Sequence, residues 1–279
     1  MIVISHVQLR PIIAARRAGL ATAATSLDLG LTSQAVQIED DRVVLTDQAW
    51  LAWATVDDIT GNPTACYLVE GGDASKIQAY STALDRLYSL FPTEGAPTVL
   101  ISGIPMHRIK DIDPLEDTRR KVRSVAPVGG RVLDTATGLG YSALEAARTA
   151  DEVVTIELDP VIQDVARLNP YSRALFDNPK IEQLFGDSSD VVETLESSSF
   201  SRVIHDPPMF ALAGQLYSAE FYHQLFRVLK LHGRLFHYIG DISSGSAKRV
   251  AQGATRRLLD VGFKRVMQRP ETFGIVAEK

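Results

Sequence analysis

The sequence predicts an α/β fold, in which a doubly wound, mostly parallel seven-stranded sheet follows a smaller α+β domain. From residue 131 onward, short apolar runs alternate with helical patterns, which is typical of parallel strands joined by crossover helices. Glycines and acidic residues follow several of these runs, where such strands end. Before residue 112 the apolar runs alternate with turn signals instead. We therefore expect two domains, 1–112 and 113–279.

The first domain is predicted to mix short strands and helices. Apolar runs at 43–45, 50–53 and 66–69 are predicted as strands, and two glycines at 71–72 mark a turn. Two segments are predicted as helices: the alanine-rich segment 11–24, and 74–91, whose apolar residues have helical spacing. We expect this domain to form a wall of the site that binds the substrate.

The second domain is predicted to begin with a helix at 114–125, with Asp113 as its N-cap and Pro114 in the first turn. Its strands are predicted at 131–134, 152–157, 180–184, 201–206, 233–239, 264–268 and 272–277. Helices are predicted between them at 140–149, 160–168, 188–196, 217–230 and 246–261. The last two strands are too close in sequence for a crossover helix, so one of them must be antiparallel.

Composition indicates a soluble, cytoplasmic protein. The chain has 279 residues and is 45% hydrophobic, but no apolar run approaches the ~20 residues that a membrane helix needs. Its first ten residues have neither the basic start nor the apolar stretch of a signal peptide. Its one cysteine, Cys66, allows no internal disulfide and no cysteine-based zinc site, and we expect no metal.

Charge is unevenly distributed. Residues 1–120 hold 10 Lys and Arg against 15 Asp and Glu, whereas the remainder is balanced. Basic residues gather late in the chain, at Lys248, Arg249, Arg256, Arg257, Lys264, Arg265 and Arg269. A nucleic-acid partner would leave such a footprint, but a solvated helix surface is the favoured interpretation. The oligomeric state is left open, and a homo-oligomer is compatible with the sequence.

The first predicted strand tip carries the main signal for a bound nucleoside. Asp134 ends a buried strand, and Gly138 and Gly140 let a ligand approach the backbone. Gly138 to Ala143 also fits a dinucleotide pattern, but three residues separate the strand from the first glycine. A carboxylate would repel a pyrophosphate and attract an amine and a sulfonium, so the tip favours S-adenosylmethionine.

The next two tips extend this site. Glu157 ends the second strand and can accept both hydroxyls of a ribose. Asp187 follows the third strand, where it can accept the exocyclic amine of adenine or cap the next helix. We assign Thr135, Leu158 and Ser188 to the same cofactor site.

The fourth tip, His205-Asp-Pro-Pro-Met-Phe210, is the most specific feature. Consecutive prolines keep the chain stiff and extended after the strand. A planar amino group could donate to the carboxylate of Asp206 and stack on Phe210. The alternative is a rigid loop without chemistry.

Residues 131–240 resemble the class I S-adenosylmethionine-dependent methyltransferases, whose sheet is Rossmann-like. The fourth tip is similar to the Asn/Asp-Pro-Pro-Tyr/Phe motif of amino-group methyltransferases. Ala136 replaces the usual first glycine of the loop, and Met209 separates the prolines from the aromatic residue. A family of predicted, mainly archaeal methyltransferases with a His-Asp-Pro-Pro motif resembles nearly the whole chain. The matching stretches include Asp28-Leu-Gly-Leu-Thr32, Thr135-Ala-Thr-Gly-Leu-Gly-Tyr141, His205-Asp-Pro-Pro208 and Leu235-Phe-His-Tyr-Ile-Gly240.

The resemblance implies cofactor roles for Asp134, Gly138, Gly140, Glu157 and Asp187, and an acceptor-side role for residues 206–210. We expect a methyltransferase in which Asp206 is catalytic and orients a nitrogen acceptor of unknown identity. His205, Pro207, Pro208, Phe210, His107 and Tyr217 are the candidate residues for binding the acceptor.

Two other functions stay open. Leu216-Tyr-Ser-Ala-Glu-Phe-Tyr222 resembles the spermidine-synthase-like aminopropyltransferases, which use decarboxylated S-adenosylmethionine. A cofactor-binding protein without catalytic activity is the third class.

Overall fold

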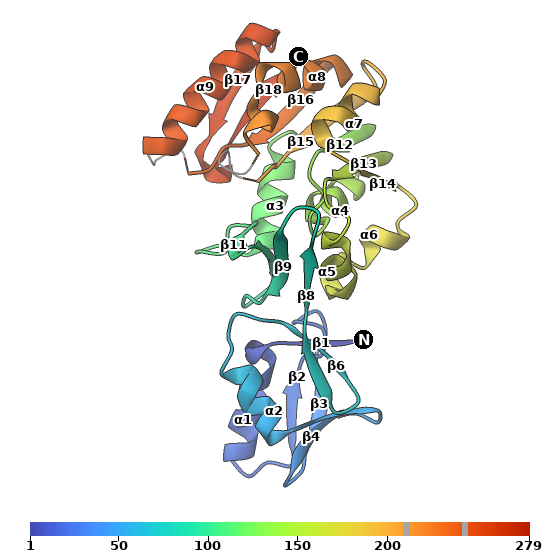
Figure 1. The fold of residues 1–279 in the computed structure, drawn as a ribbon, viewed down its shortest axis with the longest axis vertical. Coiled ribbons are helices and arrows are strands. Elements are labelled where there is room, and N and C mark those ends of the chain that lie inside the picture. The colour runs from blue at the N-terminus through green and yellow to red at the C-terminus, as the bar shows by residue number, and fades with distance from the viewer. Residues whose placement is uncertain (209–212, 242–244) are drawn as a thin grey trace. The chain divides into compact units, whose positions relative to one another are not determined.

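The computed structural model of the chain describes residues 1–208, 213–241 and 245–279, which form two compact units (Figure 1). The first unit comprises Met1–Pro114 together with Val161–Arg173. The second comprises Leu115–Pro160 and Ala174–Lys279. The segment Val161–Arg173, which the sequence predicts as part of the second domain, therefore packs with the first unit.

A seven-stranded sheet forms the centre of the second unit, in the order β14-β13-β12-β15-β16-β18-β17. Neighbours among the first five strands in this order are parallel, and β18 is antiparallel to both β16 and β17. The predicted doubly wound sheet with an antiparallel C-terminal hairpin is thus confirmed. The strands are β12 (Arg131–Asp134), β13 (Glu152–Glu157), β14 (Ile181–Phe185), β15 (Phe200–His205), β16 (Leu229–Tyr238), β17 (Arg265–Arg269) and β18 (Gly274–Glu278).

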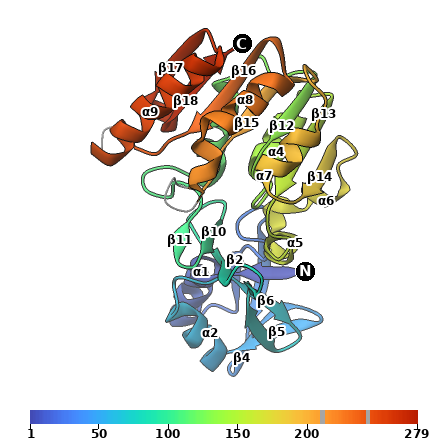
Figure 2. The ribbon, with the colours of Figure 1, turned by 45° about the horizontal axis from the view of Figure 1, so that its top comes forward.

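Helices cover both faces of this sheet, and successive strand residues enter two different cores. Val132 belongs to the core that contains residues of α3 and α4, whereas Leu133 belongs to the core of α7, α8 and α9. Burial on both faces explains why the central strands are continuously apolar. Figure 2 shows α9 beside β17 and β18, on which it packs. The helices are α3 (Pro114–Arg123), α4 (Tyr141–Ala147), α6 (Ala174–Asp177), α7 (Ser188–Thr194), η2 (Gly214–Tyr217), α8 (Ala219–Val228), α9 (Gly245–Val261) and η3 (Pro270–Thr272).

The first unit contains three small antiparallel sheets. One sheet is β1 (Ile2–Ile4), β6 (Tyr67–Glu70) and β7 (Asp73–Lys76). A second is β2 (Thr22–Thr25), β3 (Gln34–Ile38), β4 (Arg42–Thr46) and β5 (Ala49–Ala52). The third is β8 (Gln78–Ser81), β9 (Arg86–Phe91), β10 (Thr98–Ile101) and β11 (Ile104–Pro105). The helices of this unit are α1 (His6–Arg17), α2 (Trp53–Thr60), α5 (Ile162–Leu168) and η1 (Pro170–Ser172).

The prediction of a helix over 74–91 is wrong, because this segment forms β7, β8 and β9. In β9 the side chains of Tyr88 and Leu90, two residues apart, are buried, whereas Leu87, which precedes them, is exposed. That period of two belongs to a strand, and the antiparallel pairing of β9 with β8 and β10 satisfies its backbone.

The first helix also starts earlier than predicted, at His6 instead of residue 11, and ends at Arg17. Ser5 and Gln8 form a capping box, in which Gln8 accepts from the Ser5 amide and Ser5 accepts from backbone amides of the first turn. Residues 22–25, predicted as the end of this helix, form β2.

Candidate functional site

Four acidic residues lie at one edge of the seven-stranded sheet. Asp134 and Glu157 are the last residues of β12 and β13, Asp187 follows β14, and Asp206 follows β15. The four strands are parallel, so their carboxyl ends share this edge. The strand order runs from β12 through β13 to β14 on one side, and from β15 through β16 to β18 and β17 on the other. The junction between β12 and β15 is a topological switch point, where ligands of open α/β sheets bind.

Asp134 is a fully buried carboxylate with an unused oxygen. Its Oδ2 accepts a hydrogen bond from the hydroxyl of Thr155 at 3.0 Å, and its Oδ1 has no partner among the described residues. Burial raises the pKa of Asp134 to about 8; the negative charges of Asp206 and Glu157 add to this shift, and the Thr155 hydroxyl and the Ala136 amide oppose it. A cation against Oδ1 would pair the oxygen and relieve this repulsion.

The two glycines after β12 have different surroundings. Both are left-handed, with φ of 52° at Gly138 and 77° at Gly140, a conformation that favours glycine. A Cβ atom on Gly138 would have no neighbour within 4 Å, whereas one on Gly140 would lie 2.6 Å from Leu175 Cδ2. The backbone at Gly138 therefore borders open space, and Gly140 is required for packing.

Glu157 connects the second tip to this glycine turn. Its Oε2 accepts from the amide of Gly138 at 2.8 Å, and its Oε1 accepts from the amide of Asp159 at 3.1 Å. Burial raises the pKa of Glu157, and these amides oppose the shift. Each carboxylate oxygen has a second lone pair, so the side chain can still accept from a hydroxyl. The neighbouring Leu158 is 42% exposed and adds apolar surface.

Asp187 caps α7, which is one of the two roles that the sequence allows. Its Oδ1 accepts from the amide of Ser189 at 2.9 Å and from the Ser189 hydroxyl at 2.5 Å. Its Oδ2 takes part in neither bond, so capping does not exhaust the carboxylate. Ser188 is buried and donates to the carbonyl of Thr135 at 2.6 Å, which ties the third tip to the first.

Asp206 forms a buried ion pair that the sequence analysis does not anticipate. The ammonium of Lys121, on α3, lies 2.8 Å from Asp206 Oδ2 and 3.0 Å from Asp117 Oδ2. It also lies 4.5 Å from the centre of the Tyr238 ring. Burial raises the pKa of Asp206, and the positive charge of Lys121 opposes that shift. Burial disfavours the ammonium of Lys121, but the two carboxylates outweigh this effect and raise its pKa.

The sequence does contain a signal for this cluster. Asp117 and Lys121 are four apart on a predicted helix, which by itself suggests a solvated surface pair. Thr118, Val122 and Val125 extend the same helical face, however, and all three are buried. A charged pair on an apolar stripe is the pattern that indicates burial.

His205, predicted to bind the acceptor, is fully buried and has both ring nitrogens in hydrogen bonds. Its Nε2 lies 2.9 Å from the carbonyl of Leu216, so Nε2 must carry the proton and donate. Its Nδ1 then accepts from the hydroxyl of Thr135 at 2.6 Å. Burial lowers the pKa of His205 to about 3, consistent with a neutral ring. The contact with Thr135 joins β15 to β12. It uses the side chains of Thr135 and His205, which the sequence analysis assigns to binding the cofactor and the acceptor.

Tyr217 holds part of the loop that follows β15. This side chain is 1% exposed, and its hydroxyl donates to the carbonyl of Pro208 at 3.2 Å. Pro207 is buried and Pro208 is half-buried. Phe210, predicted to stack on the acceptor, lies outside the described residues.

His107, another predicted acceptor residue, belongs to the first unit. Its Nδ1 lies 2.8 Å from the hydroxyl of Thr98 on β10, and its amide donates to the same oxygen at 3.2 Å. In the first unit, His107 is therefore bonded to β10.

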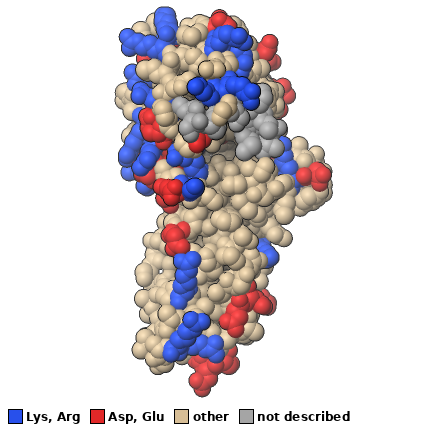
Figure 3. Space-filling view, turned by 90° about the vertical axis from the view of Figure 1, so that its left-hand side faces the viewer, with Lys and Arg blue, Asp and Glu red and all other residues tan. Residues whose placement is uncertain are grey.

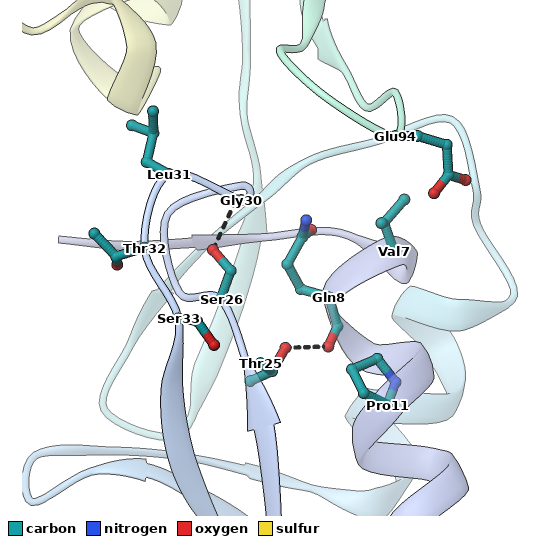
Figure 4. Close-up of a pocket in the computed structure, with 10 residues that line it drawn as sticks. All are labelled: Val7, Gln8, Pro11, Thr25, Ser26, Gly30, Leu31, Thr32, Ser33 and Glu94. Carbon is teal, nitrogen blue, oxygen red and sulfur yellow. Dashed lines mark hydrogen bonds between the residues drawn. The ribbon is translucent and has the colours of Figure 1, made fainter.

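The first unit also has a shallow pocket of about 410 Å³ beside the Asp28-Leu-Gly-Leu-Thr32 loop (Figure 4). Asp28 shapes this loop by accepting from the amide of Thr32 at 2.8 Å and from its hydroxyl at 2.7 Å. Ser26 accepts from the amide of Gly30 at 2.6 Å. Hydroxyl groups, the side chains of Val7 and Pro11 and the carboxylate of Glu94 line the pocket, which gives it a mixed surface.

The late basic residues are mostly on the surface. Lys248, Arg249, Arg256, Lys264 and Arg265 are exposed. Arg257 instead donates to the carbonyl of Tyr217 at 2.9 Å. On the face drawn in Figure 3, basic side chains are interspersed with acidic ones.

Within residues 1–208, 213–241 and 245–279, no group of three or more His, Cys, Asp or Glu side chains is arranged to hold a metal ion. No helix in this part of the chain is both long and apolar enough to cross a membrane.

Solved structures with a similar fold include spermidine synthases. One, in complex with the transition-state analogue AdoDATO, has a TM-score of 0.62 and 20% identity over 72% of each chain. Another, from Thermotoga maritima, has a TM-score of 0.58 and 18% identity over 75% of each chain. The chain therefore has the mixed α/β fold of the spermidine synthases.

No family model matches the sequence. A curated relative is 39% identical over 259 residues, which covers 91% of this chain and 88% of the relative. It is the uncharacterised protein MJ1233 of Methanocaldococcus jannaschii. At this identity and coverage, the chain belongs to the same family as this uncharacterised archaeal protein.

Proposed function

We propose that this protein is a transferase whose cosubstrate is an adenosyl sulfonium. The observation that carries the proposal is the environment of Asp134: a fully buried carboxylate with an unpartnered oxygen, at the switch point of a doubly wound sheet. A buried carboxylate is costly without a partner, and a cation is the partner that it lacks. S-adenosylmethionine and its decarboxylated form each carry an amine and a sulfonium.

The other tips fit the nucleoside. Glu157 accepts from the ribose hydroxyls with the lone pairs that its two amide contacts leave free. Asp187 Oδ2 accepts from the exocyclic amine of adenine, while Oδ1 continues to cap α7. The open space at Gly138 admits the ligand beside the backbone. Thr135 and Ser188 act indirectly, since their side chains join the tips to one another.

Aminopropyl transfer from decarboxylated S-adenosylmethionine is the reaction that the charge at this edge favours. Asp134, Glu157, Asp187 and Asp206 surround the tips, and the ammonium of Lys121 is already held by two carboxylates. A cosubstrate without a carboxylate suits this acidic edge better than one with a carboxylate. The spermidine synthase fold supports the same choice. The second unit holds 152 of the 279 residues, so a match over 72% of the chain reaches into the first unit.

Methyl transfer from S-adenosylmethionine is the second candidate. The observation in its favour is the Asp206-Pro207-Pro208 loop, which resembles the acceptor loop of amino-group methyltransferases. Tyr217 fixes the carbonyl of Pro208, so part of this loop is held in place.

The chemical step is the same in both cases. The lone pair of the acceptor attacks the carbon next to the sulfonium, the C–S bond breaks, and its electron pair returns to sulfur to give a neutral thioether. Asp206 orients an acceptor amine and takes the proton that the new ammonium loses. Positioning of this kind contributes on the order of 7–11 kcal/mol to such reactions.

The test is isothermal titration calorimetry of the folded protein with S-adenosylmethionine and with its decarboxylated form. We expect both to bind, with the decarboxylated form at least tenfold tighter. Tighter binding of S-adenosylmethionine would favour methyl transfer. Binding of neither compound would refute the proposed cosubstrate.

A further inference from the structure

We propose that Lys121 is a positioning residue that holds one oxygen of Asp206 and presents the other to the acceptor. This inference rests on the proposed function, because it concerns the carboxylate that receives the acceptor. It adds a residue that neither the strand tips nor the Pro-Pro loop contains.

The geometry of the cluster supports this role. Lys121 contacts Oδ2 of Asp206 and Oδ2 of Asp117, at 2.8 Å and 3.0 Å. The side chains of Lys121 and Asp117 are 1% and 0% exposed, whereas that of Asp206 is 13% exposed. Of the three, Asp206 alone is partly open to a ligand. Since its Oδ2 is held from the buried side, Oδ1 is the oxygen that remains for an acceptor.

Stability gives no sufficient reason for such a cluster. Two carboxylates and one ammonium carry a net negative charge, and desolvation of buried ions usually offsets their attraction. An apolar side chain at position 121 and a neutral one at 117 would fill the same space at lower electrostatic cost. The arrangement is explained if the charge of Asp206 is needed at the sheet edge.

Lys121 also affects the acceptor directly. An amine that contacts Asp206 comes near the permanently charged ammonium of Lys121, and like charges disfavour its protonated form. A nitrogen must be unprotonated to attack carbon. Lys121 therefore favours the reactive form of the acceptor while it keeps Asp206 able to take the proton afterwards.

The experiment compares the wild type with Asp117→Asn/Lys121→Met and with Lys121→Arg. The double variant removes one charge of each sign, so it avoids an unpaired carboxylate at 117; Lys121→Arg keeps the positive charge. The carboxyl carbon of Asp206 is followed by ¹³C NMR against pH, with the resonance assigned by its loss in Asp206→Asn. Near-ultraviolet circular dichroism establishes that each variant is folded.

We expect the titration midpoint of Asp206 to rise by ~1–3 pH units in the double variant, because the loss of the Lys121 ammonium outweighs the loss of the Asp117 charge, which by itself would lower the midpoint. In Lys121→Arg the midpoint should stay close to the wild-type value. The other titratable groups that face this cluster, Asp134, Tyr217 and Tyr238, are unchanged in all variants. An unchanged midpoint in a folded double variant would overturn the proposal.

A second measurement separates positioning from a structural role. Aminopropyl transfer from decarboxylated S-adenosylmethionine to 1,3-diaminopropane is measured against pH. We expect the acidic limb of kcat/KM to move upward with the Asp206 midpoint in the double variant. A uniform loss of rate with an unmoved limb would show a structural role only. If the wild type neither binds nor uses the cosubstrate, the proposed function fails, and the NMR midpoints still report on the pairing of Lys121 with Asp206.

Discussion

Two aspartates at the same sheet edge have opposite surroundings. Asp134 has an unpartnered oxygen and a pKa of about 8, whereas Asp206 is paired with Lys121. Asp134 is the last residue of β12 and Asp206 directly follows the neighbouring parallel strand β15, so their places in the fold are similar. Their neighbours differ: Asp134 accepts a hydrogen bond from the hydroxyl of Thr155, whereas Asp206 accepts one from the ammonium of Lys121. Under the proposed function, this difference suits Asp134 to receiving a cation and Asp206 to receiving a proton.

Replacement of Asp134 by asparagine is expected to weaken cosubstrate binding by about 10- to 100-fold, the usual loss for one buried hydrogen bond to a charged group. Binding by the wild type should strengthen as pH rises toward about 8, because the carboxylate must ionise to pair with the cation. The variant should lose this pH dependence. Calorimetry between pH 6 and 9 measures both effects, and a retained slope in Asp134→Asn would exclude Asp134 as its source.

The same variant should also change stability in a pH-dependent way. The pKa of Asp134 is about 8 in the folded protein against 3.8 for an ordinary aspartate, so between these pH values the folded state keeps a proton that the unfolded chain has lost. Wild-type stability should therefore fall as pH rises through this range. Asparagine does not titrate, so Asp134→Asn should gain at least ~1 kcal/mol relative to wild type at pH 9 compared with pH 5. Urea denaturation at both pH values checks this; equal differences at the two would contradict it.

At the scale of the elements, the two glycines in the turn between β12 and α4 have different surroundings. Gly140 precedes α4 and packs against Leu175, while Gly138 faces open space and donates to Glu157. The Gly-x-Gly spacing predicts the turn, but not which glycine borders open space. That distinction depends on Leu175, which lies 35 residues further along the chain.

Matched alanine substitutions test the two roles. Gly140→Ala meets both the left-handed backbone and the side chain of Leu175, so we expect a loss of at least ~2–3 kcal/mol in the free energy of unfolding. Gly138→Ala meets only the backbone strain, about 1–2 kcal/mol, and should weaken cosubstrate binding. Leu175→Ala should recover part of the Gly140→Ala loss in the double variant. Equal destabilisation by both single substitutions would contradict this assignment.

The sequence predicts the sheet of the second unit well because each central strand is buried on both faces and each ends at a polar or glycine-bearing turn. The strands at 131–134 and 152–157 match β12 and β13 to the residue. Segment 74–91 is mispredicted because short antiparallel hairpins derive their stability from partners far along the chain. Lys121 is missed for a similar reason, since its contact with Asp206 spans 85 positions.

At the scale of the whole molecule, the compact units do not follow the order of the chain. Val161–Arg173 lies between two segments of the second unit but packs with the first. Within the first unit, α5 packs on β8 and β9, and the Tyr171 hydroxyl donates to the carbonyl of Leu29 at 3.3 Å. Patterns of strand and helix residues cannot reveal this packing, because they predict that α5 is a helix but not which unit it packs with.

Hydrogen exchange should reveal this grouping. Leu51→Ala removes a fully buried side chain from the core of the first unit and should destabilise it by about 2–5 kcal/mol. We expect amides of α5 to exchange faster together with those of β8 and β9, while those of α4 and α8 change less. Mass spectrometry of peptic fragments measures this. Protection of α5 that follows α4 and α8 instead would place it with the second unit.

The position of β18 has a consequence for synthesis of the chain on the ribosome. Among the strands of the described residues, β17 pairs only with β18, which is made after it. The newly translated β17 therefore has no hydrogen-bonding neighbour until the following strand emerges and inserts against β16. Until then β17 keeps an unpaired edge.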